Sequence, residues 1–363
     1  MHSPARGVST NLRVRRATPV TNRGRPFAST LSQDTSMASD KADTQLLRVL
    51  SLNVHGWHNA DKSSWEGLIT MLKAMQPDVV ALQEATKHRV PELAHELGDM
   101  HWTTRNNCAI LSRLQLCVEH DQVRGCGRKR EEISGYAGKC KAAGALHSHS
   151  DLKRGHFQRF CGAAIDVDGL PQPLEIVCLH LDHVHESNRL SQLRDLVQTR
   201  LTTGRSPLQV WCGDFNALSL RDYAEHEIRT ITRQRARNNW EPPVDHLTTV
   251  MTNPETKRAT ARNTKSDPGL GFIDCWHAAE ERFGPLGTSR FDSRIDYVFC
   301  SPALMAGGTD VAKATVRSCQ HLQTIPHVSD HNAVFVVLET TECATQRPTT
   351  LPRASRSTTV DNS

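Results

Sequence analysis

The sequence predicts an α/β fold with one main core, because strand-like apolar runs alternate with segments whose apolar residues recur at helical spacing. The first run covers residues 46–54, and a helix follows in which Trp65, Leu68, Ile69, Leu72 and Met75 share one face. A second buried strand, 78–84, comes next. Strands alternating with helices favour a sheet that is covered by helices.

The same alternation continues along the chain. Further strands are predicted at 107–112, 160–167, 174–180, 209–213, 295–299 and 332–338. The strand at 174–180 is followed by a helix with the apolar stripe Leu190, Leu193, Val197 and Leu201. The stretch 229–270 is polar, contains proline and lacks periodicity, so it is predicted to be rich in loops.

Three segments differ in composition from this core, which spans 46–339. Residues 1–45 contain six arginines among small and hydroxyl residues, with no acid before Asp34, which is typical of a transit peptide to chloroplast or mitochondrion. A basic arm that touches nucleic acid is the alternative, and a start at Met37 would leave a cytoplasmic or nuclear form. A basic surface insertion is predicted at 121–159 and a disordered tail at 340–363.

The composition, 37% hydrophobic and 23% charged, is that of a soluble globular protein, and no apolar run predicts a transmembrane segment. The formal charge of +5 favours polyanionic partners only weakly, since much of it lies outside the core. Among eleven cysteines there is no CxxC pair, and Cys178, Cys212 and Cys300 lie in apolar runs. They are predicted to be reduced core thiols. No motif indicates a protein partner.

Polar residues capable of phosphoryl chemistry follow several of these strands. Asp214 and Asn216 come directly after an apolar strand, so both side chains can reach one cleft. A carboxylate there can orient or deprotonate a water, and a neutral amide can hold it without repelling an anionic substrate. Glu84 ends another strand, where a hard divalent ion such as Mg²⁺, or Mn²⁺ as the alternative, is its natural partner. Asn53 ends the first strand and is predicted to help hold that ion.

Two histidines occupy similar positions. His180 finishes its strand, and Asp330 and His331 precede the last one. We predict that Asp296 pairs with His331, which would raise the pKa of the imidazole and let it stabilise developing phosphorane charge. Each motif alone has a structural explanation as a cap or turn. Their occurrence together, each at the end of an apolar run, favours an active site.

In order, these motifs resemble the signature of the endonuclease/exonuclease/phosphatase superfamily over about residues 46 to 339. They are Leu52-Asn53, Leu82-Gln83-Glu84, Leu179-His180-Leu181, Gly213-Asp214-Phe215-Asn216, Arg294-Ile295-Asp296-Tyr297 and Ser329-Asp330-His331. Segments 213–218 and 290–297 are also similar in sequence to a plant and algal branch of that family. The resemblance implies a four-layer αββα sandwich, two mixed β-sheets flanked by helices, with the site in the groove at the sheet ends.

The resemblance also implies roles for individual residues. Metal binding falls to Glu84 with Asn53 and Asp330, and water activation and positioning fall to Asp214 and Asn216. Phosphorane stabilisation falls to His180 and to His331, which Asp296 orients. One departure is His55, because members that cut abasic DNA or tyrosyl-DNA links usually carry an acid there.

Several other residues have two interpretations. Arg189 and Gln192 are predicted to pack beneath the site. Arg159 and Arg294 could meet phosphates but are interpreted as surface or packing residues. Most tryptophans belong to cores or rims, although Trp57, Trp102 and Trp276 could offer stacking platforms for bases.

The leading functional hypothesis is magnesium-dependent hydrolysis of phosphodiester bonds in nucleic acid. The alternative keeps the chemistry and changes the substrate to a phosphorylated lipid or another small phosphate ester, since the motifs address only the phosphate. A catalytically silent binding protein of the same fold is disfavoured, because Glu84, Asp214 and His331 are all present.

Overall fold

The computed structural model of the protein describes residues 44–55, 62–117, 160–201, 206–254, 269–306, 313–324 and 328–341. Nearly all of the predicted presequence, the whole insertion at 121–159 and nearly all of the predicted tail lie outside the described residues, as do Trp57 and Arg159. The strand predicted to open the core at residue 46 begins at Thr44, and the last strand ends at Thr341.

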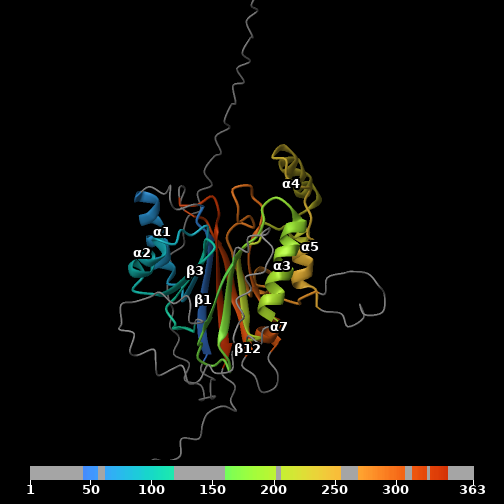
Figure 1. Ribbon diagram of the computed structural model, residues 1–363. Helices are drawn as coiled ribbons and strands as arrows, with labels where there is room; N and C mark the ends of the chain where they lie inside the picture. The colour runs from blue at the N-terminus through green and yellow to red at the C-terminus, as the bar shows by residue number, and fades with distance from the viewer. Residues whose placement is uncertain are drawn as a thin grey trace, which may run out of the picture. The chain divides into compact units, whose positions relative to one another are not determined.

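The described strands form two mixed β-sheets (Figure 1). The first sheet contains β1 (Thr44–Asn53), β2 (Val79–Gln83), β3 (His101–Arg105), β4 (Cys108–Ser112), β10 (Glu281–Phe283), β12 (Lys313–Leu322) and β13 (Ala333–Thr341). The second contains β5 (Leu116–Cys117), β6 (Phe160–Ile165), β7 (Leu174–His180), β8 (Gln209–Asp214), β9 (Ile273–Asp274) and β11 (Asp296–Cys300). Their strand orders are β10-β12-β13-β1-β2-β4-β3 and β5-β6-β7-β8-β11-β9.

Helices cover the outer face of each sheet. On the first sheet, α1 (Lys62–Met75) and α2 (Arg89–Glu96) pack through Leu68, Leu72 and Leu93. On the second, α3 (Glu186–Leu201) and α5 (His246–Thr252) pack through Leu193 and Met251. Figure 1 shows the two helical layers on opposite sides of the strands, so the predicted four-layer αββα sandwich is confirmed. None of the described helices could span a membrane.

Both faces of the central strands are buried, and most of their residues are apolar. In β7, Ile176 and Cys178 belong to the core between the sheets, whereas Val177 and Leu179 pack toward the helices. Such strands read as continuous apolar runs, which is why the sequence predicts them well. The cysteines in these runs are buried free thiols, as predicted.

One prediction of irregular structure is wrong. Within 229–270, predicted to be loop-rich, the structure contains most of α4 (Glu225–Arg237) and all of α5. In α4 only Ile231 and Arg235 are buried, so the helix has almost no apolar stripe from which to recognise it. Two other short helices, α6 (Cys275–Ala278) and α7 (Pro302–Ala306), a 3₁₀ turn at Leu220–Asp222 and the polar strand β12 also lack a clear sequence signal.

The strand register brings the polar strand ends of the second sheet together. Asp214 lies opposite His180 of the parallel neighbour β7 and opposite Asp296 of the antiparallel neighbour β11. Just before it, Gly213 has φ +144°, and a Cβ there would lie 1.9 Å from the carbonyl oxygen of Leu179. Only glycine permits this close approach of β8 to β7.

We expect Gly213→Ala to lower the free energy of unfolding by about 3 kcal/mol, because the new methyl group meets backbone that cannot move aside. Gly98 is the matched control, since it also has positive φ but no atom within 4 Å of the place that a methyl group would take. Gly98→Ala should cost only about 1 kcal/mol in urea unfolding. Equal losses in the two variants would contradict the argument from close approach.

Candidate active site

The candidate site is organised around the carboxylate of Asp214, the last residue of β8, which is 2% exposed. Its Oδ2 accepts a hydrogen bond from Asn53 Nδ2 at 3.0 Å. The Nε2 atoms of His180 and His331 lie 3.6 and 3.9 Å from the same oxygen. Its Oδ1 accepts the backbone N–H of Asn216 at 2.9 Å. Side chains from both sheets therefore converge on this carboxylate.

Asn53 links Asp214 to Glu84. Its Nδ2 also lies 3.3 Å from Glu84 Oε1, and its Oδ1 accepts the backbone N–H of His55 at 2.9 Å. Glu84 follows β2 directly and has φ +57°, a left-handed conformation that costs a non-glycine residue roughly 1 kcal/mol. Such strained positions concentrate at functional sites, where the surrounding structure maintains them.

Asp296 and His331 form the predicted pair, with Oδ2 of the carboxylate 2.9 Å from Nδ1 of the imidazole. Burial raises the pKa of Asp296 to about 6, against the lowering effect of the His331 charge. Burial also acts to lower the pKa of His331, but the charge and hydrogen bond of Asp296, together with Asp214, raise it to about 10. At neutral pH the pair is therefore an aspartate and an imidazolium, with Nε2–H on the side of Asp214.

The segment that carries His331 is fixed against the end of β1. Ser329 Oγ donates to the backbone oxygen of Asn53 at 2.5 Å and accepts the backbone N–H of His331 at 3.0 Å. Asp330, predicted as a metal ligand, contacts an imidazole and a guanidinium: Oδ1 lies 3.2 Å from His55 Nδ1, and Oδ2 lies 3.3 Å from Arg290 Nη1. Asp330 thus lies at the rim of the site, beside His331.

Asn216 is oriented by two further constraints. Its Nδ2 donates to the carbonyl oxygen of Leu181 at 3.1 Å, and its backbone has φ +50°. The amide oxygen is then the atom that can accept a hydrogen bond from a water or from a substrate hydroxyl. The positioning role of Asn216 stays a prediction.

The donor set fits a hard divalent cation. Glu84, Asp214 and Asp330 supply carboxylate oxygens and Asn53 an amide, which are ligands that Mg²⁺ prefers. Among the described residues, Oδ1 of Asp296 and Oδ1 of Asp330 are buried and accept no hydrogen bond, although Oδ1 of Asp330 lies 3.2 Å from His55 Nδ1. Ligand atoms of Asp214, Asp296 and His331 also lie within 4.8 Å of one another. We do not predict these three residues to bind a metal together, because a protonated His331 has no lone pair to offer. Their predicted roles are to activate water and to stabilise developing negative charge.

Several residues singled out in the sequence are structural. Arg294 is 1% exposed and forms ion pairs with Asp222 and Asp274, so it does not meet phosphate. Arg189 is equally buried and pairs with Glu186 and Glu241 beneath the site.

Three further side chains also have packing roles. Gln192 Oε1 accepts the backbone N–H of Asp182 at 2.8 Å. Trp276 stacks on His321 with ring centroids 4.0 Å apart, and Trp102 packs on the helix-side core of the first sheet.

The sequence did not reveal how Asp296 is held in place. Thr288 is fully buried, and its Oγ1 accepts the backbone N–H groups of Ile295 and Asp296 at 3.0 Å each. Tyr223 Oη accepts the backbone N–H of Arg294 at 2.6 Å. No sequence pattern around Thr288 indicates this supporting role, because its hydrogen-bond partners lie where an irregular loop enters β11.

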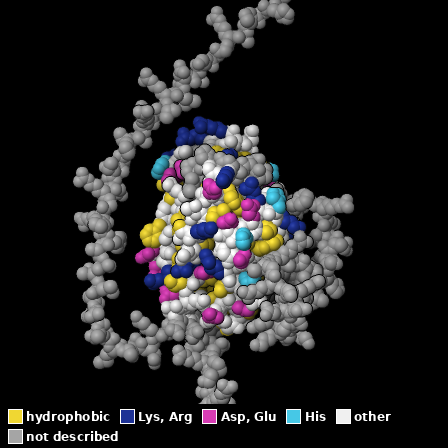
Figure 2. Space-filling view, turned by 90° about the vertical axis from the view of Figure 1, so that its left-hand side faces the viewer, with side chains coloured by type: hydrophobic (Ala, Val, Ile, Leu, Met, Phe, Trp, Pro, Cys, Tyr) yellow, Lys and Arg dark blue, Asp and Glu magenta, His cyan; other side chains and the backbone are white. Residues whose placement is uncertain are grey.

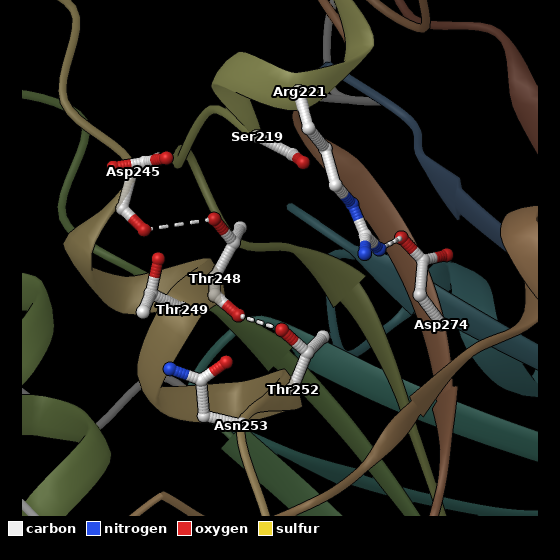
Figure 3. Close-up of a pocket in the computed structure, with 8 residues that line it drawn as sticks. All are labelled: Ser219, Arg221, Asp245, Thr248, Thr249, Thr252, Asn253 and Asp274. Atoms are coloured by element: carbon white, nitrogen blue, oxygen red, sulfur yellow. Dashed lines mark hydrogen bonds and ion pairs between the residues drawn. The ribbon is translucent and has the colours of Figure 1, made fainter.

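A small polar pocket of about 140 Å³ lies apart from these residues, between α5 and Asp274 (Figure 3). Arg221 reaches across it toward Asp274, and Thr248 Oγ1 donates to the backbone oxygen of Asp245. None of the predicted site residues lines it. The pocket is therefore separate from the candidate active site.

Two stacked sheets with acidic, amide and imidazole groups at the strand ends define a phosphoesterase of the α/β-sandwich class. The sequence profile of the Endonuclease/Exonuclease/phosphatase family matches residues 50–331. The chain therefore belongs to this family, whose members are phosphoester hydrolases. No curated protein matches the chain.

Several solved structures are similar to this chain. An endonuclease/exonuclease/phosphatase from Bacteroides vulgatus is 13% identical, with a TM-score of 0.50 over 81% of this chain and 98% of that one. The human Nocturnin catalytic domain with bound sulfate is 14% identical, with a TM-score of 0.46 over 83% and 98%. A mannosyl-6-phosphatase from Bacteroides thetaiotaomicron is 14% identical, with a TM-score of 0.45 over 80% and 99%.

In a titration of the metal-free protein followed by NMR, we expect Asp296→Asn to lower the pKa of His331 by about two pH units. The reason is that the variant removes the charge that raises this pKa and leaves the effect of burial. His95, whose pKa is raised by the separate carboxylate of Asp99, is the internal control and should titrate unchanged. An unaltered His331 titration would contradict the assigned pair.

Proposed function

We propose that the protein is a magnesium-dependent phosphodiesterase that cleaves nucleic acid. The observation that carries the proposal is the position of the Asp214 carboxylate, between Asn53 with Glu84 on one side and two imidazoles on the other. A phosphate that binds there has a base for water and imidazole donors close to it.

Each residue then has a defined task. Asp214 accepts a proton from the attacking water, and the Asn216 amide oxygen holds that water in position. His331, kept protonated by Asp296, donates a hydrogen bond to a non-bridging phosphate oxygen as negative charge develops on it. His180 stabilises the same phosphate group. Mg²⁺ bound at Asn53, Glu84 and Asp330 would neutralise negative charge on the phosphate and polarise it.

Charge supports a divalent ion at this site. Four negative charges lie here, on the carboxylates of Glu84, Asp214, Asp296 and Asp330. Only two positive charges, on His331 and Arg290, oppose them. An anionic phosphate would be repelled by the remaining carboxylates unless a cation intervened. The net charge of the chain, +5, adds only weak support for nucleic acid as the substrate, since much of that charge lies outside the core.

The test is cleavage of labelled RNA and DNA with Mg²⁺, with chelator, and with Asp214→Asn. We expect Mg²⁺-dependent cleavage that falls about 10³-fold in the variant, since it loses the base that activates water. Asp168→Asn, a substitution at an exposed acid, is the matched control and should cleave normally.

Two results would overturn the proposal. One is a failure of every strand to be cleaved in a metal- and Asp214-dependent manner. The other is phosphate release only from a panel of phosphoinositides, sphingomyelin and small phosphate esters, which would assign the same chemistry to the alternative substrate class.

A further inference from the structure

Helix α4 carries an exposed basic face. Arg229, Arg233 and Arg237 are spaced by four residues, so they lie along one side of the helix, and all three are exposed. The face extends about 12 Å at 1.5 Å per residue. Both acids of α4, Glu225 and Glu227, lie in its first turn. The remaining turns are therefore cationic.

This face is not required for the packing of α4. The buried residues Ile231 and Arg235 lie two positions beyond Arg229 and Arg233, on roughly the opposite side of the helix. Arg235 secures that side by donating from Nε to the backbone oxygen of Glu241 at 2.6 Å. Cations in the last turn complement the helix dipole, but Arg229 and Arg233 precede that turn.

The partners of the basic face leave its charge largely available. Arg229 pairs with Glu225 and is 60% exposed. Arg233 bonds only to Thr230 and to a backbone oxygen of the same helix. Within the described part of the chain, no carboxylate pairs with Arg233 or Arg237.

A continuous set of contacts connects α4 to the rim of the active site. Arg290 binds Asp330, and its guanidinium lies 4.7 Å from the ring centroid of Phe291. Phe291 meets Trp240 edge to face, with centroids 5.2 Å apart. Trp240 follows α4, and its backbone N–H donates to the oxygen of Arg235 at 2.9 Å. Both rings are half-buried, so part of each is accessible to a ligand.

The location of α4 distinguishes this face from the rest of the described surface. Figure 1 shows α4 projecting beyond the ends of α3 and α5. On the side that bears α1 and α2, shown in Figure 2, basic and acidic side chains are interspersed. A single-sign cationic face is therefore not a general property of the surface.

We propose that the basic face of α4, with the Trp240–Phe291 pair and Arg290, binds a single-stranded nucleic acid that extends from the scissile phosphate. Guanidinium groups bind successive phosphates, and aromatic rings stack on bases of any sequence. Aromatic rings beside cationic groups, which suit stacked bases and phosphates, and the contact of Arg290 with Asp330 at the rim of the candidate site favour a strand over a membrane surface. This inference rests on the proposed function, since the strand must reach the same site.

The test uses the full chain and the triple variant Arg229→Gln/Arg233→Gln/Arg237→Gln. Binding to a fluorescent oligothymidylate or oligouridylate of about 12 nucleotides is measured by anisotropy without metal, over a range of salt. We expect affinity to fall about tenfold, and the slope of log affinity against log salt to decrease by about 2, for three lost phosphate contacts. Arg113→Gln is the control, since this exposed arginine lies at the opposite end of β4 from the site.

Cleavage assays on a long and a short substrate distinguish a failure of this inference from a failure of the proposed function. The variant should lose kcat/KM on the long strand while a dinucleotide, too short to reach α4, is cleaved at the parental rate. Strand binding that is equal in parent and triple variant, or an equal loss in Arg113→Gln, would overturn the inference whether or not the parent cleaves. Parental binding to anionic phospholipid vesicles but not to the strand, lost in the triple variant, would also overturn it, in favour of a membrane.

Discussion

The hydrogen bond from Asn53 to Asp214 is the contact on which the site depends, because it joins the two sheets at their polar ends. Stacked sheets are separated by about 10 Å, so side chains must bridge the space between them. Among the described residues most of that space is filled by apolar side chains, and Gln83, whose Nε2 lies 3.1 Å from Cys178 Sγ, is a second polar bridge next to Glu84. The packing of the two sheets therefore determines the distance between Asn53 with Glu84, the proposed metal ligands, and Asp214, the proposed base.

Three local arrangements keep Asp214 in that position. Gly213 lets β8 approach β7, which places Asp214 beside His180. Across the opposite edge of β8, Asp296 is held by Thr288, and the preceding turn is anchored by Arg294 with its two aspartates. A buried ion pair contributes little net stability, but removing one of its partners leaves an uncompensated charge. The Arg294 cluster thus imposes a fixed geometry on the strand that carries Asp296.

The sequence predicted the central strands and the site residues for the same reason. A strand that is buried on both faces is an unbroken apolar run, and a charged residue at its end stands out, as Glu84, His180 and Asp214 do. The sequence could not predict α4, which has almost no apolar face, or the support for Asp296 from Thr288 and Arg294. Those contacts join residues from irregular loops, and the periodicity of apolar residues does not predict which loops pack together.

The predicted metal ligands illustrate the same limit. Asn53 and Glu84 were expected to act together, and a hydrogen bond joins their side chains. Asp330 was grouped with them from its place in a motif, whereas the structure adds His55 and Arg290 as its immediate neighbours. Long-range charge neighbours of this kind follow from the packing of loops and carry no signal in local sequence.

The pairing of β1 with β13 has a consequence for the synthesis of the protein. These two strands come from opposite ends of the core, yet they are adjacent in the sheet, and the Ser329 hydroxyl closes onto Asn53. During translation β2, one neighbour of β1, emerges early, but nearly the whole domain must be made before the other neighbour, β13, emerges. The group that contains Asn53, Asp214 and His331 therefore cannot assemble on a partial chain, and an incomplete product of the ribosome carries no finished active centre.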